Sequence, residues 1–328
     1  MDEQQQMPMD CFVGLDIAKA KVDVCLRLSS GKHREKVVAN SLVGFAELTN
    51  WLSKHGVVRA HICMEATGAY WEAIAQHLHD AGHAVSVVNP AQIKAFGSAL
   101  GMRSKTDAAD AKVIAEFCAA RPPALWQAPP AAVRLLKALV SRREALIELR
   151  IQESNRLEGV HEGVRASIEH LVQVLQEQIR QIEQQIRQHI DDDPTLKTQR
   201  DLLATVPGLG DATVPVLLSH YGGPARFSSA KQAVAFAGLD VRHHESGTSV
   251  RGRPHLSKRG NAKLRKAMYM PALVSMRLTA WGKAFAARLL AAGKPKMVVL
   301  GALMRKLVQI AYAILRTGKS FDPTLHSA

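Results

Sequence analysis

The sequence has little cysteine, and this scarcity excludes two kinds of architecture. Its 328 residues include only four cysteines, at positions 11, 25, 63 and 118, and no two of them form a C-x-x-C pair. Zinc cages and disulfide-stapled domains both need cysteines at close and regular spacing. We therefore expect four reduced thiols, mostly buried.

The sequence also lacks an uninterrupted apolar run that could cross a membrane. Its longest apolar stretch, residues 297–315, is broken by Arg305 and Lys306, whereas a spanning helix needs about 20 mostly apolar residues. The first ten residues, MDEQQQMPMD, have neither the basic nor the apolar region of a secretory signal. Apolar residues still make up 47% of the chain, which is enough for real cores. We expect a cytoplasmic protein with no membrane partner.

Acidic residues are scarce in the last quarter of the chain. Residues 241–328 hold 17 lysines and arginines but only two acids, a net charge of +15, while residues 1–240 sum to −1. This concentration of positive charge indicates a polyanionic partner, since each cation that neutralises a phosphate also releases counterions. The segment has only five aromatic residues, so we expect phosphate contacts more than base stacking. A basic surface that only confers solubility is the alternative.

Strand and helix patterns alternate between Cys11 and about Ala120. Three apolar, β-branched runs, CFVGLDI, KVDVCLRL and HREKVVAN, predict three consecutive strands. A helix over 43–55, the strand AHICME, a helix over 70–81 and the strand AVSVVN follow, and then helices over about 91–100 and 107–120. This order predicts an α/β domain in which helices flank a mixed sheet.

A proline-rich stretch and a long helical segment come next. RPPALWQAPP, at 121–130, predicts a linker. Residues 133–190 are rich in Leu, Ile, Glu, Gln and Arg, and part of this segment repeats apolar residues at alternating spacings of three and four. These residues are Val172, Leu175, Ile179, Ile182 and Ile186. Such a coiled-coil seam must be buried in an internal antiparallel hairpin or against a second copy of the chain, and we expect both.

The glycine-rich turn VPGLG, at 206–210, lies between two predicted helices. Gly208 and Gly210 would leave backbone N–H groups uncovered at the start of the second helix, where a phosphate oxygen can bind. Asp211 or Thr213 can cap that helix, and Pro215 falls near its first turn. An ordinary helical hairpin that binds no ligand is the alternative.

Four carboxylates stand out by their positions. Asp16 ends the first predicted strand and Glu65 ends the fourth, while Asp107 and Asp110 share one face of a predicted helix. Carboxylates that converge in this way repel one another unless a divalent cation lies between them. Oxygen ligands favour Mg²⁺ or Mn²⁺, and a pair of such ions supports phosphoryl transfer. For each acid taken singly, a solvated surface charge or a helix cap is the alternative interpretation.

Two other patterns lack the residues that would make them sites. TGKS at 317–320 ends like a phosphate-binding P-loop, but Ala313 stands where the first glycine is required. His243, His244 and His255 have no metal-ligand spacing. We therefore expect neither nucleoside triphosphate binding nor a transition-metal site at these positions.

Small, polar and basic residues crowd the segment that begins at Glu245. They predict an exposed loop, followed by a basic helix from about Asn261. A serine beside Arg251 and Arg253 can be activated toward phosphate, because the guanidinium groups would hold the phosphodiester and stabilise developing charge. From spacing alone, Ser246 before Gly247 is most simply a turn residue.

Several motifs, taken in order, resemble those of one family. They are LDIAK around Asp16, EATG at 65–68, KTDAADA at 105–111, VPGLG at 206–210, FAGL at 236–239, and ESGTSVRG with SKRGNAKLRKAMYMPA. The combination covers nearly the whole chain and is similar to the bacterial DEDD-type insertion-sequence transposases, the bridge-RNA-guided recombinases. The resemblance implies a RuvC-like domain of the RNase H fold at 1–125, a helical coiled-coil region at 126–195, and a mostly helical C-terminal transposase domain at 196–328.

The resemblance also implies roles for individual residues. Asp16, Glu65, Asp107 and Asp110 would form the catalytic tetrad that binds Mg²⁺ or Mn²⁺. Ser246 would be the nucleophile that forms a phosphoserine with DNA, with Ser249 and Ser257 as its nearby competitors. The residues expected to bind nucleic acid are Arg251, Arg253, Lys258, Arg259, Lys263, Arg265, Gly208 and Gly210.

The implied partners are a guide (bridge) RNA, double-stranded donor and target DNA, and further copies of this chain. A dimer, or a tetramer in the synapse, would join the acids of one subunit to the serine of another at the bacterial nucleoid. Base pairing by the RNA would select the sequence while the protein holds backbone and shape. Two alternatives stay open: a metal-dependent junction nuclease that uses water and no RNA, and a non-catalytic RNA-binding scaffold.

Overall fold

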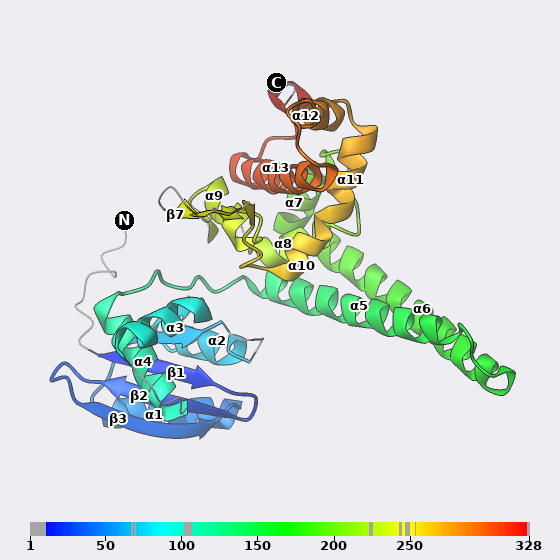
Figure 1. Ribbon diagram of the computed structural model, residues 1–328. Coiled ribbons are helices and arrows are strands. Elements are labelled where there is room, and N and C mark those ends of the chain that lie inside the picture. Colours follow the sequence, from blue (N-terminus) through cyan, green and yellow to red (C-terminus); the bar gives the residue numbers. More distant parts are fainter. Residues whose placement is uncertain are drawn as a thin grey trace. The chain divides into compact units, whose positions relative to one another are not determined.

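A computed structural model of the chain describes residues 11–66, 68, 70–101, 107–222, 226–242, 245–246, 250–252 and 254–326. The chain divides into two compact units at the bond between Ala128 and Pro129. Each unit has a hydrophobic core of its own. The first is built around a sheet, and the second is almost entirely helical (Figure 1).

A five-stranded mixed sheet forms the centre of the N-terminal unit (Figure 1). Its strands are β1 (Phe12–Ile17), β2 (Lys21–Arg27), β3 (His33–Ala39), β4 (His61–Glu65) and β5 (Ala84–Val88). They lie in the order β3-β2-β1-β4-β5, with β1, β2 and β3 antiparallel and with β4 and β5 parallel to β1. Tight turns can join only antiparallel neighbours, so the two parallel additions each follow a helix.

Helices cover both faces of this sheet. On one face, α1 (Leu42–Lys54) and α2 (Glu72–Asp80) pack on a core that includes Val13 and Leu15. On the other face, α3 (Pro90–Ala99) and α4 (Asp107–Ala120) pack on Cys63 and Cys25. The period-two alternation of β1 therefore sends its residues to two separately covered faces. The mixed sheet with flanking helices expected from the sequence is confirmed.

The proline-rich segment after α4 is anchored to the outer edge of β5. Ser86 Oγ lies within hydrogen-bond distance of the carbonyl oxygens of Pro123 (3.1 Å) and Ala124 (3.0 Å). The backbone N–H of Trp126 donates to the Val85 carbonyl oxygen at 2.7 Å. The indole ring of Trp126 packs edge-on against Trp71, with ring centroids 5.9 Å apart. Much of the segment expected to be a linker is thus held on the sheet.

The C-terminal unit consists mainly of helices, whose bounds follow. They are α5 (Ala131–Arg156), α6 (Glu162–Asp192), α7 (Pro194–Ala204), α8 (Val214–Tyr221), α9 (Ala230–Phe236), α10 (Ala262–Ala267), α11 (Tyr269–Leu278), α12 (Ala280–Ala291) and α13 (Lys296–Thr317). A short 3₁₀ helix, Pro323–His326, comes after α13.

The helices α5 and α6 form a long hairpin (Figure 1). Leu146 of α5 packs with Leu175 and Ile179 of α6, and Ile186 and Ile190 join the main core of the unit. Three residues of the apolar seam predicted on α6, Leu175, Ile179 and Ile186, are therefore buried within this chain, while Val172 and Ile182 are half-buried. The expected contact with a second copy of the chain stays a prediction.

Helix α13 is long and apolar enough to cross a membrane by length and composition, but 67% of its most apolar window is buried. Leu303, Leu307 and Ala311 are fully buried on it at the centre of the unit. A helix that is buried on most of its sides carries apolar residues on most of its sides, and this accounts for the apolar composition of α13. Gly318 ends α13 in the left-handed conformation, with φ of 66°. TGKS is therefore a helix end, in agreement with the rejection of a P-loop.

Candidate functional site

Asp16 and Glu65 lie at the carboxyl ends of two adjacent parallel strands, β1 and β4. The register of β1 with β4 runs from Phe12 opposite His61 to Leu15 opposite Met64, so Asp16 and Glu65 are the next residue on each strand. Adjacent strands lie about 4.8 Å apart, and matching positions point to the same face. Both residues are half-buried. The sheet therefore brings two carboxylates that are distant in sequence to one edge.

Helix α4 crosses this face with its first turn toward the same edge. It passes so close to β1 that a Cβ on Gly14 would lie 2.1 Å from the Ala111 carbonyl oxygen. Farther along α4, Cys118 Sγ lies 3.6 Å from the carbonyl oxygen of His61, at the opposite end of β4. The helix thus runs antiparallel to β1 and β4, and the half-buried Asp110 lies toward the edge that carries the other two acids.

The fourth predicted acid, Asp107, is the first residue of α4. Its side chain lies outside the described part of the structure. Among the residues that are described, no three His, Cys, Asp or Glu side chains come close enough to hold a metal ion. The structure therefore brings the positions of Asp16, Glu65 and Asp110 toward one edge of the sheet, and the metal-binding tetrad stays a prediction.

The chemistry of this face suits a hard cation. Burial, assisted by the charge of Glu35, raises the pKa of the Cys25 thiol to about 11. A hydrogen bond with Cys63, together with burial, raises the pKa of Cys118 as well. These two buried thiols on the same face of the sheet therefore stay protonated at neutral pH and are poor soft-metal ligands. The carboxylate oxygens that remain are the donors typical of Mg²⁺ or Mn²⁺.

A further acid lies beside the predicted set. Asp23 is paired with Asp16 in the register of β1 and β2, and cross-strand partners point to the same face. It is 6% exposed, and its Oδ2 lies 3.0 Å from Lys21 Nζ. The tight connection between LDI and KVDV, with alternate residues facing one side, is the sequence signal that could have identified Asp23.

Short ribbons hold the chain around Ser246. β7 (Glu245–Ser246) pairs antiparallel with β8 (Val250–Arg251), with Ser246 opposite Val250. β6 (Val241–Arg242) pairs with β9 (His255–Leu256). The side chains of Ser246 and Arg251 are outside the described residues, and so are Ser249 and Arg253 as a whole. The segment expected to be a loop therefore contains paired backbone on both sides of Ser246.

Two of the expected nucleic-acid-binding cations make contacts within the protein. Lys263 Nζ lies 2.8 Å from Glu144 Oε2, which ties α10 to α5. The Arg265 guanidinium lies within hydrogen-bond distance of the carbonyl oxygens of Ala237 (3.2 Å) and Lys258 (3.4 Å). Because Arg265 holds two chain segments together, its role in the described structure is to support the fold around the basic segment.

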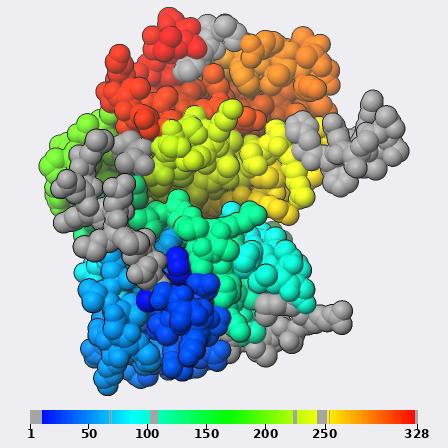
Figure 2. Space-filling model, turned by 90° about the vertical axis from the view of Figure 1, so that its left-hand side faces the viewer, coloured from blue at the N-terminus to red at the C-terminus, as the bar shows by residue number. Residues whose placement is uncertain are grey.

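Lys258 and Arg259 differ from these two cations because both are exposed. The chain segment that leads up to them, yellow in Figure 2, reaches the surface of the C-terminal unit. Lys258 has φ of 52°, an uncommon conformation for a residue other than glycine, and it turns the chain sharply before α10. The preceding Ser257 donates its hydroxyl to the carboxylate of Asp240. That hydroxyl is already engaged, which disfavours Ser257 as a competitor of Ser246.

The glycine turn before α8 is partly explained by packing. Gly208 has φ of +101°, and a Cβ there would lie 3.1 Å from the Pro271 carbonyl oxygen of α11, whereas the space around Gly210 is open. Thr213 occupies the N-cap position of α8 without a side-chain capping hydrogen bond, so the expected cap at Thr213 is not made. Separately, the buried Arg143 donates from Nη2 to the Ala212 carbonyl oxygen at 2.9 Å and anchors the turn to α5.

Two family models match the sequence. Residues 13–164 match the model DEDD_Tnp_IS110, described as a transposase, and residues 200–287 match the model Transposase_20, described as the transposase IS116/IS110/IS902 family. The chain belongs to the IS110 family of transposases. The first match contains Asp16, Glu65 and Asp110, and the second contains the glycine turn and Ser246. The resemblance seen in the sequence motifs is thus confirmed at the level of the family.

Named relatives cover nearly the whole transposase. It is 37% identical over 319 residues to the pilin gene-inverting protein of Moraxella lacunata, which covers 96% of this chain and 98% of that protein. It is 26% identical over 363 residues to the transposase for insertion sequence element IS1328 of Yersinia enterocolitica, with 96% and 100% covered. The chain is therefore a DNA recombinase or transposase, and DNA is its substrate.

Proposed function

We propose that this transposase cuts and rejoins DNA strands through a composite site made of the acidic sheet edge and Ser246, under the guidance of an RNA. The observation that carries the proposal is the convergence of Asp16, Glu65 and the first turn of α4 on one edge. Three elements from different parts of the chain position acids at this edge. Half-buried carboxylates close to one another do not help a sheet to fold, so their convergence supports a functional role.

The N-terminal unit is proposed to be a RuvC-like domain of the RNase H fold. Three antiparallel strands followed by two parallel ones, in the order β3-β2-β1-β4-β5, support this assignment. In such a sheet the carboxyl ends of β1 and β4 lie side by side, and functional residues of α/β sheets gather at the carboxyl ends of strands.

The acids are proposed to hold a divalent cation, Mg²⁺ or Mn²⁺, as DEDD transposases commonly do. Such an ion would supply charge stabilisation at the scissile phosphate. The chain's own part is to hold carboxylates at fixed positions: Asp16 and Glu65 through strand pairing, and Asp110 through the packing of α4 on Gly14.

Ser246 is proposed to be the nucleophile. Its Oγ would form a bond to the phosphorus while the bond from phosphorus to one sugar oxygen breaks; the serine proton leaves, and the sugar oxygen gains a proton. The reverse reaction with a different strand end would rejoin DNA and free the serine. The paired backbone of β7 and β8 supports this role because it holds the serine in a defined place.

The guide RNA and a multimeric assembly are proposed on charge and sequence grounds. The exposed Lys258 and Arg259 belong to a strongly basic and aromatic-poor segment, which suits contact with phosphate backbones. The open space at Gly210, before the N-terminus of α8, could admit a phosphate oxygen. A dimer or tetramer would join the acids of one subunit to the serine of another.

The decisive experiment follows the covalent adduct. The full-length protein is incubated with co-purified RNA, both DNAs and Mg²⁺, and adducts are separated on a denaturing gel. We expect adduct with the wild type and with Ser257→Ala, no adduct with Ser246→Ala, and no cutting but retained RNA binding with Asp16→Asn. An adduct with Ser246→Ala would refute the serine role, and cutting without any adduct or RNA would indicate a nuclease that uses water.

A second candidate function is the inversion of a DNA segment. The pilin gene-inverting proteins of Moraxella lacunata and Moraxella bovis are 37% and 36% identical to this chain, against 26% for the Yersinia enterocolitica transposase. Inversion and transposition can use the same strand exchange and differ in how the sites are arranged. A plasmid with two sites in opposite orientation distinguishes them, since inversion changes its restriction pattern and excision shortens it.

A further inference from the structure

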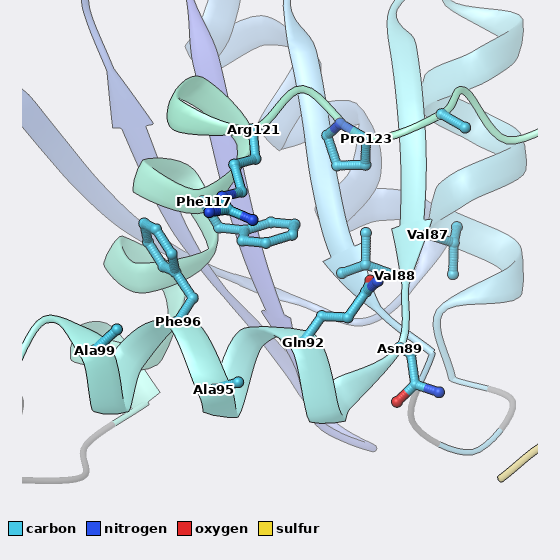
Figure 3. A pocket seen from close by; sticks show the side chains of 11 residues that line it. Val87, Val88, Asn89, Gln92, Ala95, Phe96, Ala99, Phe117, Arg121 and Pro123 are labelled. Atoms are coloured by element: carbon cyan, nitrogen blue, oxygen red, sulfur yellow. The ribbon is translucent and has the colours of Figure 1, made fainter. Parts of the chain in front are cut away.

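A pocket of about 680 Å³ lies beside the outer edge of β5, within the N-terminal unit (Figure 3). This volume is in the range of about 300 to 1,000 Å³ that is typical of ligand sites. Its walls come from the end of β5, from α3, from the last turns of α4 and from residues 121–124. The residues that matter to the argument are Val88, Gln92, Ala95, Phe96, Phe117 and Arg121.

The pocket begins next to the candidate acidic edge. Val88 is the register partner of Glu65 in the pairing of β4 with β5, and the Ala66 N–H donates to the Val88 carbonyl oxygen at 2.9 Å. Because register partners point to the same face, Glu65 and Val88 lie on the face that α3 and α4 cover. If a phosphate of a nucleic-acid strand lay at the acids, the neighbouring nucleotides of that strand would therefore lie close to the pocket.

The lining combines aromatic walls with polar groups at the rim. Phe96 and Phe117 meet edge-to-face, with centroids 5.4 Å apart and planes at 76°. In Figure 3, the side chain of Arg121 points toward Phe117, and Gln92 extends from α3 toward Val88. Among the described residues that line the pocket, none is acidic. Aromatic surface, an amide and one guanidinium match the flat apolar face, the polar edge and the phosphate of a nucleotide.

We propose that this pocket binds one unstacked base of the nucleic-acid strand that is held at the acidic edge. The inference rests on the proposed function, because it assumes that a strand lies along that edge. Ala95 and the other small residues of α3 leave the space that the base would fill. The base would be held by shape complementarity and stacking, with Gln92 near its polar edge and Arg121 near its phosphate. These contacts depend little on the identity of the base, so the site would position the nucleic-acid strand more than it would select a sequence.

The test compares strands with and without bases. Binding of the full-length protein to a short oligothymidine strand and to an abasic strand of equal length is measured by fluorescence anisotropy. The abasic strand keeps every phosphate, so the difference in affinity between the two strands measures the contribution of the bases. We expect the wild type to bind the base-bearing strand about 5- to 100-fold more tightly, the range of one base stacked on an aromatic side chain.

The pocket variant is Ala95→Phe, which fills the space from an exposed position of α3, and its matched control is Ala91→Phe, on the same helix and outside the lining. We expect Ala95→Phe to lose the preference for bases and Ala91→Phe to keep it. A preference that survives in Ala95→Phe, or a wild type with no preference, would overturn the proposal. Parallel oligouridine strands show whether the bound strand is DNA or RNA.

Asp16→Asn separates this proposal from the proposed function. That variant should lose cutting and keep the preference for bases, because the acid is outside the pocket lining. If Asp16→Asn still cuts DNA, the catalytic role of the acids fails, and the pocket is still judged by the loss of preference in Ala95→Phe.

Discussion

Gly14 of β1 lies directly under the carbonyl oxygen of Ala111 in α4, so close that a Cβ on Gly14 would be 2.1 Å from that oxygen. No side chain fits between the strand and the helix at this point. The contact sets the distance between α4 and the sheet. The start of α4 lies toward the edge of the sheet where Asp16 and Glu65 are found, at the carboxyl ends of β1 and β4.

Gly14→Ala should disrupt the packing of α4 on the sheet. The new methyl group meets backbone atoms, which cannot rotate away, so we expect a loss of unfolding free energy of about 1–3 kcal/mol or more, together with a loss of DNA cleavage. Urea denaturation followed by circular dichroism measures the first effect. Unchanged stability would mean that α4 does not pack this closely.

Gly97→Ala is the matched control. Gly97 lies inside α3, where a Cβ would be 3.5 Å from Val113 Cγ1, an ordinary contact. Because alanine restricts the unfolded chain and favours helix, we expect a gain of about 0.5–1 kcal/mol and normal cleavage.

His220 should make the C-terminal unit sensitive to acid. The ring is 6% exposed, and burial, together with the charge of Lys137, lowers its pKa from 6.5 to about 4. The unfolded chain takes up a proton below about pH 6.5, while the folded protein resists it until about pH 4. Stability should therefore be complete above pH 6.5 and should fall by on the order of 3 kcal/mol as the pH drops to about 4.

The measurement is urea denaturation between pH 7 and pH 4 for the wild type and for His220→Gln, whose side chain does not titrate. The difference between the two pH profiles isolates His220, since the buried His61 and His83 also have lowered pKa values and titrate in both proteins. Parallel profiles would contradict the prediction.

Arg259 and Arg265 should affect nucleic-acid binding differently. Arg259 is exposed, so Arg259→Ala should weaken binding to every sequence and reduce the salt slope of the affinity by about 1. Arg265 holds two backbone carbonyl groups, so Arg265→Ala should mainly lower thermal stability. Affinities at several salt concentrations and melting curves separate the two effects, and an unchanged slope for Arg259→Ala would contradict the prediction.

Trp126 should stabilise the N-terminal unit although it lies in the proline-rich segment. Its indole packs edge-on against both Trp71 and His79. Trp126→Ala should lower the unfolding free energy by about 2 kcal/mol, less than the ~3–5 kcal/mol of a fully buried tryptophan. Gln127→Ala, at an exposed neighbour, should have no measurable effect. Circular dichroism during urea unfolding measures both, and equal curves would show a segment that is free in solution.

Several features followed from local pattern. The strand and helix order up to Ala120 and the helix start after Asn261 each depend on residues within a few positions, so periodicity and capping chemistry predict them. Asp16 and Glu65 were predicted at strand ends and Asp110 on one face of a helix, and the structure places these positions toward one edge of the sheet, while their role as metal ligands stays a prediction. The anchoring of residues 123–126 on β5 and the hydrogen bond from Arg143 to the turn before α8 were not predicted, because each depends on partners far away in the sequence.

What the sequence determined by itself is the order of elements in the N-terminal unit, the family and the concentration of positive charge near the end of the chain, since these depend on composition, short-range spacing and motif order. The tertiary structure alone decided that Asp23 lies opposite Asp16, that Arg265 supports the backbone, and that a pocket lies beside Glu65. The physical reason is that packing brings distant segments into contact, and the cost or benefit of each contact depends on both partners at once.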